Sequence, residues 1–402
     1  MIRQHRRWMV FLLAAIGGWL FERAGPGLAW HWLFGLAFGG VLVRSGVCFV
    51  AAVRDPVLTG GTTYTRAILA ALALSTVGFT VVTLITGQTG TVRPFGWGTV
   101  IGGLIFGIGM VLAGGCVSGT IMRMGDGFAM QWVGFSGIFS GLMLGTRLSG
   151  SPWLNRSLGA GKVFLPSVLG WPASLALQFV LLLGLWFLAV WQETRRFGLR
   201  RATDGQDGLA EDNGEDCAWP VLNRLDDWLR RPLGGALLLA GLNIGYFAVT
   251  GRPWGIITEM SYWASEAWRW LGHLPGGSAY LGDQAWQLQG PGLLTRPGTI
   301  FNIGILIGAF AISYASAQWR WRPMRHHRQI AAAWVGGLLV GLGSRLAVGC
   351  NIGNLFSGLP SLSLHSWLFL PSLVVGGVLG VRIASRLLFR PVLRLSSERA
   401  KR

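Results

Sequence analysis

Two cysteines, each preceded by a glycine, are the residues of this sequence best suited to chemistry. Cys116 lies in GGLIFGIGMVLAGGCVSG at 102–119, and Cys350 lies in GGLLVGLGSRLAVGCNIG at 336–353. Ten of the eighteen positions are identical, and the whole chain has only four cysteines. A neutral thiol is a weak hydrogen-bond donor that can contact a soft sulfur or selenium atom without burying a fixed charge. The repeat therefore predicts two equivalent thiol contacts.

Each Gly-Cys pair ends an apolar segment, and polar residues follow it. A helix break at such a place exposes backbone N–H groups, and a new short helix that starts there favours an anion. Irregular backbone at membrane depth is tolerated only where it is buried in protein or lines a cavity. We therefore predict that these residues contact a substrate: Cys48, Cys116, Cys350, Gly115, Gly349, Ser118, Asn351, Arg44 and Arg345.

Cys48 joins this set because it stands in a similar apolar setting, whereas Cys217 lies among acidic residues and receives no role. Arg44 is the ionisable residue nearest to Cys48 in the sequence, and Arg345 is the nearest to Cys350. A charge inside a membrane span is a functional candidate by default.

The same features also have purely structural interpretations. A GxxxG ladder is a common helix-packing surface, an isolated cysteine is a common small core residue, and an arginine near a helix end can snorkel. His365 is interpreted as a hydrogen-bonding residue at a helix start. No CxxC, HExxH or His-Cys spacing occurs, so no metal site or other cofactor is predicted. The paired placement of the cysteines favours a functional role.

The composition shows what must position these residues. Hydrophobic residues make up 51% of the chain and charged residues 12%, which is about half the charged fraction of a soluble protein. The net charge of +18 comes from arginines between apolar runs, which is typical of a membrane protein rather than of a nucleic-acid-binding one. The predicted spans are 8–22, 30–50, 66–86, 97–116, 129–148, 167–191, 233–250, 299–319, 331–350 and 365–385.

The spans form two halves, 1–191 and 232–390, joined by a polar linker at 192–231 and followed by a basic tail at 391–402. Neither of the two lysines lies in a GxxxxGK[ST] motif, so a primary ATP pump is not expected. The spans contain no internal carboxylate that would relay protons.

The distribution of arginine predicts the orientation. Both termini, the linker and the Arg320–Arg328 loop are expected on the cytoplasmic side, and ten crossings satisfy all four positions. The span ending at Cys116 then runs inward and the span ending at Cys350 runs outward. The repeats are therefore predicted to be inverted, a construction that many transporters share. A short interfacial helix is predicted near Met260–Leu271 on the outer side.

The sequence resembles the YeeE/YedE family of membrane proteins, which import thiosulfate and have a branch linked to selenium metabolism. The matching segments are RSGVCFVAAVRD at 44–55, IGGLIFGIGMVLAGGCVSGTIMR at 101–123, TGRPWGIIT at 250–258 and GLGSRLAVGCNIGNLFSGLPSLSLHSW at 341–367. The resemblance implies an all-α polytopic protein of the bacterial inner membrane, with inverted pseudo-symmetry, re-entrant helices and about nine crossings. It also implies that Cys48, Cys116 and Cys350 line the substrate path and hold thiosulfate by transient hydrogen bonds.

The function expected from these observations is import of a small sulfur anion, most simply thiosulfate, and not an enzymatic reaction. Transport of selenite or selenide is one alternative. A membrane thiol that accepts a persulfide and passes it on is another, and a structural scaffold is a third. The expected partners are the anion, the lipid bilayer and a small cytoplasmic sulfur carrier that docks on the Arg320–Arg328 loop.

Overall fold

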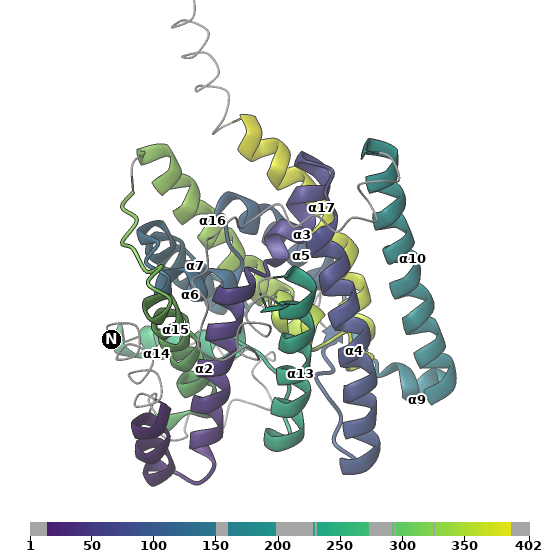
Figure 1. The fold of residues 1–402 in the computed structure, drawn as a ribbon, viewed down its shortest axis with the longest axis horizontal. Helices are drawn as coiled ribbons and strands as arrows, with labels where there is room; N and C mark the ends of the chain where they lie inside the picture. The colour runs from purple at the N-terminus through teal and green to yellow at the C-terminus, as the bar shows by residue number, and fades with distance from the viewer. Residues whose placement is uncertain are drawn as a thin grey trace, which may run out of the picture.

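The computed structural model describes residues 14–149, 160–197, 228–229, 231–272, 292, 295–324 and 326–386, and this part of the chain is mainly helical with almost no strand (Figure 1). After helical residues 14–24, the first half contains α2 (Leu28–Ser45), α3 (Phe49–Leu58), α4 (Thr63–Thr86), α5 (Trp97–Leu112), α6 (Val117–Gly125), α7 (Ala129–Ser149), α9 (Leu165–Leu169) and α10 (Trp171–Phe197). The second half contains α13 (Pro232–Thr250), α14 (Ile257–Trp270), α15 (Pro297–Ala315), α16 (His327–Leu346), the short π-helix η3 (Ile352–Phe356) and α17 (Leu364–Ala384). The predicted all-α class is confirmed.

Eight of the described helical segments are long and apolar enough to cross a membrane. They confirm a polytopic membrane protein and match eight of the predicted spans. The ends differ by about five residues or fewer, except that two of the segments continue through a break into α3 and α6. The predicted span at 129–148 forms α7, which is long enough but less apolar. The span predicted at 8–22 begins outside the described residues.

Glycines bring α5 and α16 into backbone contact. A Cβ on Gly109 of α5 would lie 2.7 Å from the carbonyl oxygen of Gly336, and a Cβ on Gly343 of α16 would lie 2.6 Å from the amide nitrogen of Phe106. Gly102, near the start of α5, likewise meets the end of α16, so the two helices run antiparallel. Small residues allow such close approach between membrane helices. The packing interpretation of the glycine ladder is therefore confirmed.

The helix contacts form matched pairs between the halves. α5 packs against α17 as α16 packs against α7, and α2 packs against α15 as α13 packs against α4. Each contact turns into its counterpart when α5 is exchanged with α16, α7 with α17, α4 with α15, and α2 with α13. A two-fold axis that relates two antiparallel helices is perpendicular to them. This pattern supports the inverted repeat, which remains a prediction.

Two smaller features complete the architecture. β1 (Pro94–Phe95) pairs antiparallel with β2 (Ala160–Lys162), Pro94 opposite Lys162 and Phe95 opposite Ala160. α10 lies at the edge of the bundle in Figure 1, with 22% of its most apolar stretch buried. α10 continues to Phe197, so the first residues of the predicted linker are helical, while 198–227 lies outside the described residues.

The predicted helix near Met260–Leu271 is α14, and an ion pair ties it to the start of α15. Arg296 Nε lies 3.1 Å from Glu259 Oε2, and the Arg296 guanidinium lies 4.1 Å from the centre of the Tyr262 ring. Burial raises the pKa of Glu259, and the charge of Arg296 opposes that rise. The helix itself is confirmed, and its interfacial position remains a prediction.

Candidate functional site

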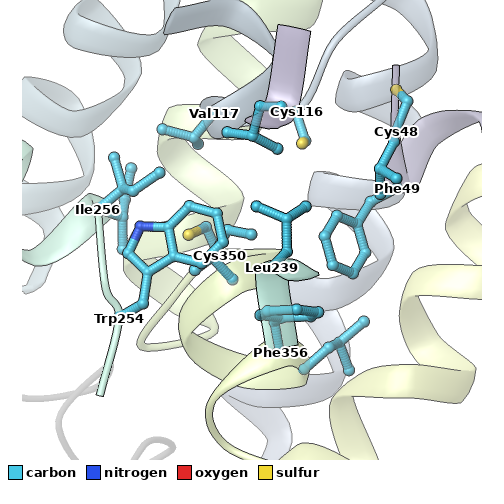
Figure 2. Packing of buried hydrophobic residues seen from close by; sticks show 14 of the residues in the cluster. Cys48, Phe49, Cys116, Val117, Leu239, Trp254, Ile256, Cys350 and Phe356 are labelled. Atoms are coloured by element: carbon cyan, nitrogen blue, oxygen red, sulfur yellow. The ribbon is translucent and has the colours of Figure 1, made fainter. Parts of the chain in front are cut away.

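Three cysteines from distant parts of the chain are members of the main hydrophobic core, and the part of that core shown in Figure 2 is called the cysteine cluster below. Cys48 comes from the break between α2 and α3, Cys116 from the break between α5 and α6, and Cys350 from the break after α16. Their exposed fractions are 8%, 2% and 1%. The fold thus brings together the thiols that the sequence analysis selected, with apolar side chains such as Leu239 and Phe356 beside them.

The three cysteines share one local geometry. The carbonyl oxygen of each accepts a hydrogen bond from the backbone N–H four residues later, which belongs to Ala52, Thr120 and Asn354 in turn. Each cysteine therefore stands where a new helical segment begins, as predicted for Cys116 and Cys350. Neither Cys48 nor Cys116 caps its helix with its side chain.

A left-handed residue produces each break. It stands two positions before the cysteine: Gly46 with φ 60°, Gly114 with φ 67° and Val348 with φ 55°. Glycine adopts this conformation without steric cost, whereas a β-branched residue adopts it only when its surroundings enforce it. The conformation of Val348 shows that the surrounding structure holds the break at Cys350 firmly.

Two arginines bind the carbonyl groups at the breaks. Arg123 donates to the carbonyl oxygen of Gly114, and Arg93 donates to that of Val348 and, at 3.1 Å, to Asn354 Oδ1. Helix C-termini leave carbonyl groups without helical partners, and a cation there is favourable. Both guanidinium groups therefore have a structural role, and both place a positive charge close to a Gly-Cys break.

Sequence reasoning did not find Arg93, which stands 255 positions before its partner Val348. Arg123 ends a family-like segment, but nothing in the sequence showed what it binds. Gly349 is needed because a Cβ there would collide with the Arg93 guanidinium and with Asn354 Oδ1. A Cβ on Gly353 would lie 2.8 Å from Arg93 Nη2.

Buried polar atoms accompany the thiols. Ser118 Oγ lies 3.3 Å from Cys116 Sγ, and Asn351 Nδ2 lies 3.6 Å from Met110 Sδ. Asn351 Oδ1, Thr120 Oγ1 and Gln131 Oε1 have no hydrogen-bond partner among the described residues. These polar atoms are therefore available to hydrogen-bond to a bound molecule.

Gly115 allows two of these polar groups to approach the first break. A Cβ on it would lie 3.1 Å from Gln131 Oε1 and 3.2 Å from Thr120 Oγ1. In the part of the chain that the structure describes, no three His, Cys, Asp or Glu side chains are placed to hold a metal ion.

The two arginines selected from the sequence lie at helix ends. Arg44 is in the last turn of α2 and is half-buried, and Arg345 is in the last turn of α16 and is 1% exposed. The stem of Arg345 packs against Gly145 of α7. Their roles in substrate binding remain predictions. His365 hydrogen-bonds to the Pro94 carbonyl oxygen at 2.7 Å, which confirms its interpretation as a hydrogen-bonding residue at a helix start.

Comparison with known proteins places the chain among transporters. A family model described as sulphur transport matches residues 44–379. The thiosulfate transporter TsuA of Spirochaeta thermophila is 28% identical over 357 residues, covering 84% of this chain and 92% of that protein. TsuA of Escherichia coli is 30% identical over 363 residues, covering 85% and 90%. The probable transporter YedE of Escherichia coli is 34% identical over 156 residues, covering 39% and 38%.

Proposed function

This chain belongs to the sulphur transport family of membrane proteins, and from that premise we propose that it imports thiosulfate. Two relatives that align along most of the chain are named thiosulfate transporters. The observation that carries the proposal is the cluster of three buried cysteines, each at the start of a helical segment. A purely structural role for the cysteines would not require the same backbone geometry three times.

The proposed mechanism uses two kinds of contact. The neutral thiols of Cys116 and Cys350 donate hydrogen bonds to the terminal sulfur of thiosulfate at the constriction, and Cys48 contacts the ion where it enters or leaves. Amide groups at the starts of α3 and α6 and the positive charges of Arg93 and Arg123 stabilise the oxygen end. No covalent bond forms, because each contact must be weak enough to release the ion.

The arrangement in the membrane follows from the same proposal. The pseudo-two-fold axis passes between α5 and α16, and the substrate path lies where the halves meet. We place the protein in the bacterial inner membrane with both termini and the linker cytoplasmic. The termini and most of the linker lie outside the described residues. The predicted Arg320–Arg328 loop is shorter in the structure, because α16 begins at His327. Arg320 in the loop and Arg328 in the first turn of α16 are exposed, which supports docking of a small sulfur-carrier protein.

The first test is uptake of labelled thiosulfate by proteoliposomes that contain only this protein. Cys116→Ala and Cys350→Ala are each expected to lose uptake, because each removes one of the two thiols at the constriction. Cys217→Ala is the matched control, since it removes a cysteine to which no role is assigned and should leave uptake unchanged.

Two results would contradict this mechanism. Normal uptake by folded Cys116→Ala and Cys350→Ala variants would show that the ion does not depend on these thiols. A sulfur adduct on Cys350, detected by intact mass after incubation with thiosulfate, would instead indicate a persulfide relay.

A further inference from the structure

The loop at 251–256 leads from the protein surface into the cysteine cluster. Arg252 is exposed, whereas Trp254 is 1% exposed and Ile256 is fully buried. Trp254 belongs to the same buried cluster as the three cysteines, and Figure 2 shows Trp254 and Cys48 at opposite sides of it. A tryptophan that follows an exposed arginine is therefore placed against the proposed path.

The indole N–H of Trp254 has no hydrogen-bond partner within the described part of the chain. Its nearest aromatic neighbours are Phe38, Phe356 and Phe301, with ring centroids 4.3, 5.8 and 6.4 Å away, and none of these side chains offers an oxygen or nitrogen acceptor. A buried indole N–H usually has a partner, because leaving a donor unpaired costs free energy. The missing partner points to a molecule that is bound only at times.

The backbone of Trp254 is held firmly, so the open N–H is not a result of a loose loop. Its N–H donates to Asn243 Oδ1 at 3.0 Å, and its carbonyl oxygen accepts from Ser357 Oγ at 2.7 Å. The Asn243 side chain also donates to the carbonyl oxygen of Phe356. Phe356 and Ser357 follow Cys350 in the same segment, and these bonds therefore fix Trp254 relative to the break at Cys350.

The loop has a counterpart in the first half. α2 ends at left-handed Gly46, and Cys48 then begins α3; α13 ends at left-handed Gly251, and residues 251–256 lead to α14. The loop thus stands where the first half carries Cys48, but it contains no cysteine. We propose that the indole N–H of Trp254 is a fourth hydrogen-bond donor to the transported anion and takes the place of the absent thiol. This inference rests on the proposed function.

The chemistry of the side chain suits this role. An indole N–H only donates, carries no charge and is a stronger donor than a thiol, so it can bind either the sulfur or an oxygen of thiosulfate. The surrounding aromatic rings hold it in one orientation and keep water away. Along the whole cluster, the anion then meets only uncharged hydrogen-bond donors of modest strength.

The test compares Trp254→Phe, which keeps an aromatic ring and removes the N–H, with Trp32→Phe. Trp32 is the matched control because its indole N–H is also buried without a partner in the described chain, yet it lies in a separate apolar cluster. In proteoliposomes, Trp254→Phe is expected to reduce thiosulfate uptake at low concentration about tenfold or more, the size of a hydrogen bond to a charged group. Trp32→Phe is expected to match the wild type.

Equal uptake by Trp254→Phe and the wild type would overturn the inference. An equal loss in both variants would do the same, because it would show a packing effect common to buried tryptophans. Absence of uptake by the wild type would instead count against the proposed function.

A second measurement detects binding in the wild-type protein itself. In wild-type protein labelled with ¹⁵N at the indole nitrogens, thiosulfate is expected to move one slowly exchanging indole signal downfield, and Trp254→Phe should lack that signal. If no buried indole signal moves at saturating thiosulfate, the inference is wrong, whether or not Trp254→Phe folds. If the indole signal moves but the wild-type protein takes up no thiosulfate, Trp254 binds the anion and the proposed transport function is wrong.

Discussion

At the scale of single residues, the site combines weak donors with fixed charges. The three thiols are buried, whereas Arg93 and Arg123 bind backbone carbonyls beside the breaks. A dianion that loses its water needs positive charge close by, but a cation directly on the path would retain it. Holding each guanidinium on a helix C-terminus keeps the charge near the path and limits its reach.

Arg93→Gln tests the charge at the second break. The substitution removes the hydrogen bonds to Val348 and Asn354, and the loss of a charged donor is expected to cost about 2 kcal/mol of stability. We also expect a higher KM for thiosulfate, because a positive charge near Cys350 is lost. Thermal unfolding in detergent and uptake kinetics measure the two effects.

Arg54→Gln is the control for this variant, since Arg54 is 44% exposed and pairs only with its neighbour Asp55 in the structure described. It should change stability and KM little. A folded Arg93→Gln variant with an unchanged KM would assign Arg93 a purely structural role.

At the scale of elements, antiparallel helices in backbone contact form the centre of the molecule. α5 and α16 touch through glycines at both ends of their crossing, and their last residues lead into the breaks before Cys116 and Cys350. A change in the spacing of these two helices would therefore shift both breaks. A side chain inserted into the crossing would change packing and site together.

Gly109→Ala tests this coupling. Its Cβ would lie 2.7 Å from both the Gly336 carbonyl oxygen and the Val340 amide nitrogen, so the helices must separate. We expect a loss of about 1–3 kcal/mol of stability, together with reduced uptake. Gly184→Ala in α10 is the control, because its Cβ would meet no atom within 4 Å and alanine favours a helix. A stable, fully active Gly109→Ala variant would show that the crossing tolerates a wider spacing.

At the scale of the whole molecule, two halves with matched helix contacts enclose one cysteine cluster. The halves are not identical at the site, since the first half contributes Cys48 and Cys116 and the second contributes Cys350 and Trp254. In the proposed mechanism, this asymmetry gives the two ends of the path different donors. An importer has use for that difference, because the ion must bind on one side and leave on the other.

The selectivity of the whole transporter for thiosulfate over selenite can be tested by competition. Excess unlabelled thiosulfate should abolish uptake of the labelled ion, whereas the same excess of selenite should leave most of it. Selenite has no terminal sulfur for the thiols to contact. Competition in proteoliposomes measures this directly. Equal competition by selenite that is reversed when selenite is washed out would favour a selenium cargo, which remains an alternative prediction.

The sequence alone determined much of the fold and the thiols of the site. Apolar runs long enough to span a bilayer predicted the helices, and α14 was found from its composition. The internal repeat selected Cys116 and Cys350, because a shared rare residue stands out against a glycine-rich background. These signals are local: each depends on residues within one span or on a direct comparison of two spans.

Only the tertiary structure decided how these parts meet. It showed that the glycine ladder packs helices, that Arg93 binds the break at Cys350, and that Trp254 lies in the cysteine cluster with an open N–H. None of this follows from periodicity or composition, because each contact joins residues far apart in the chain. Hydropathy places a residue inside or outside a membrane helix, whereas packing of whole helices selects its neighbour.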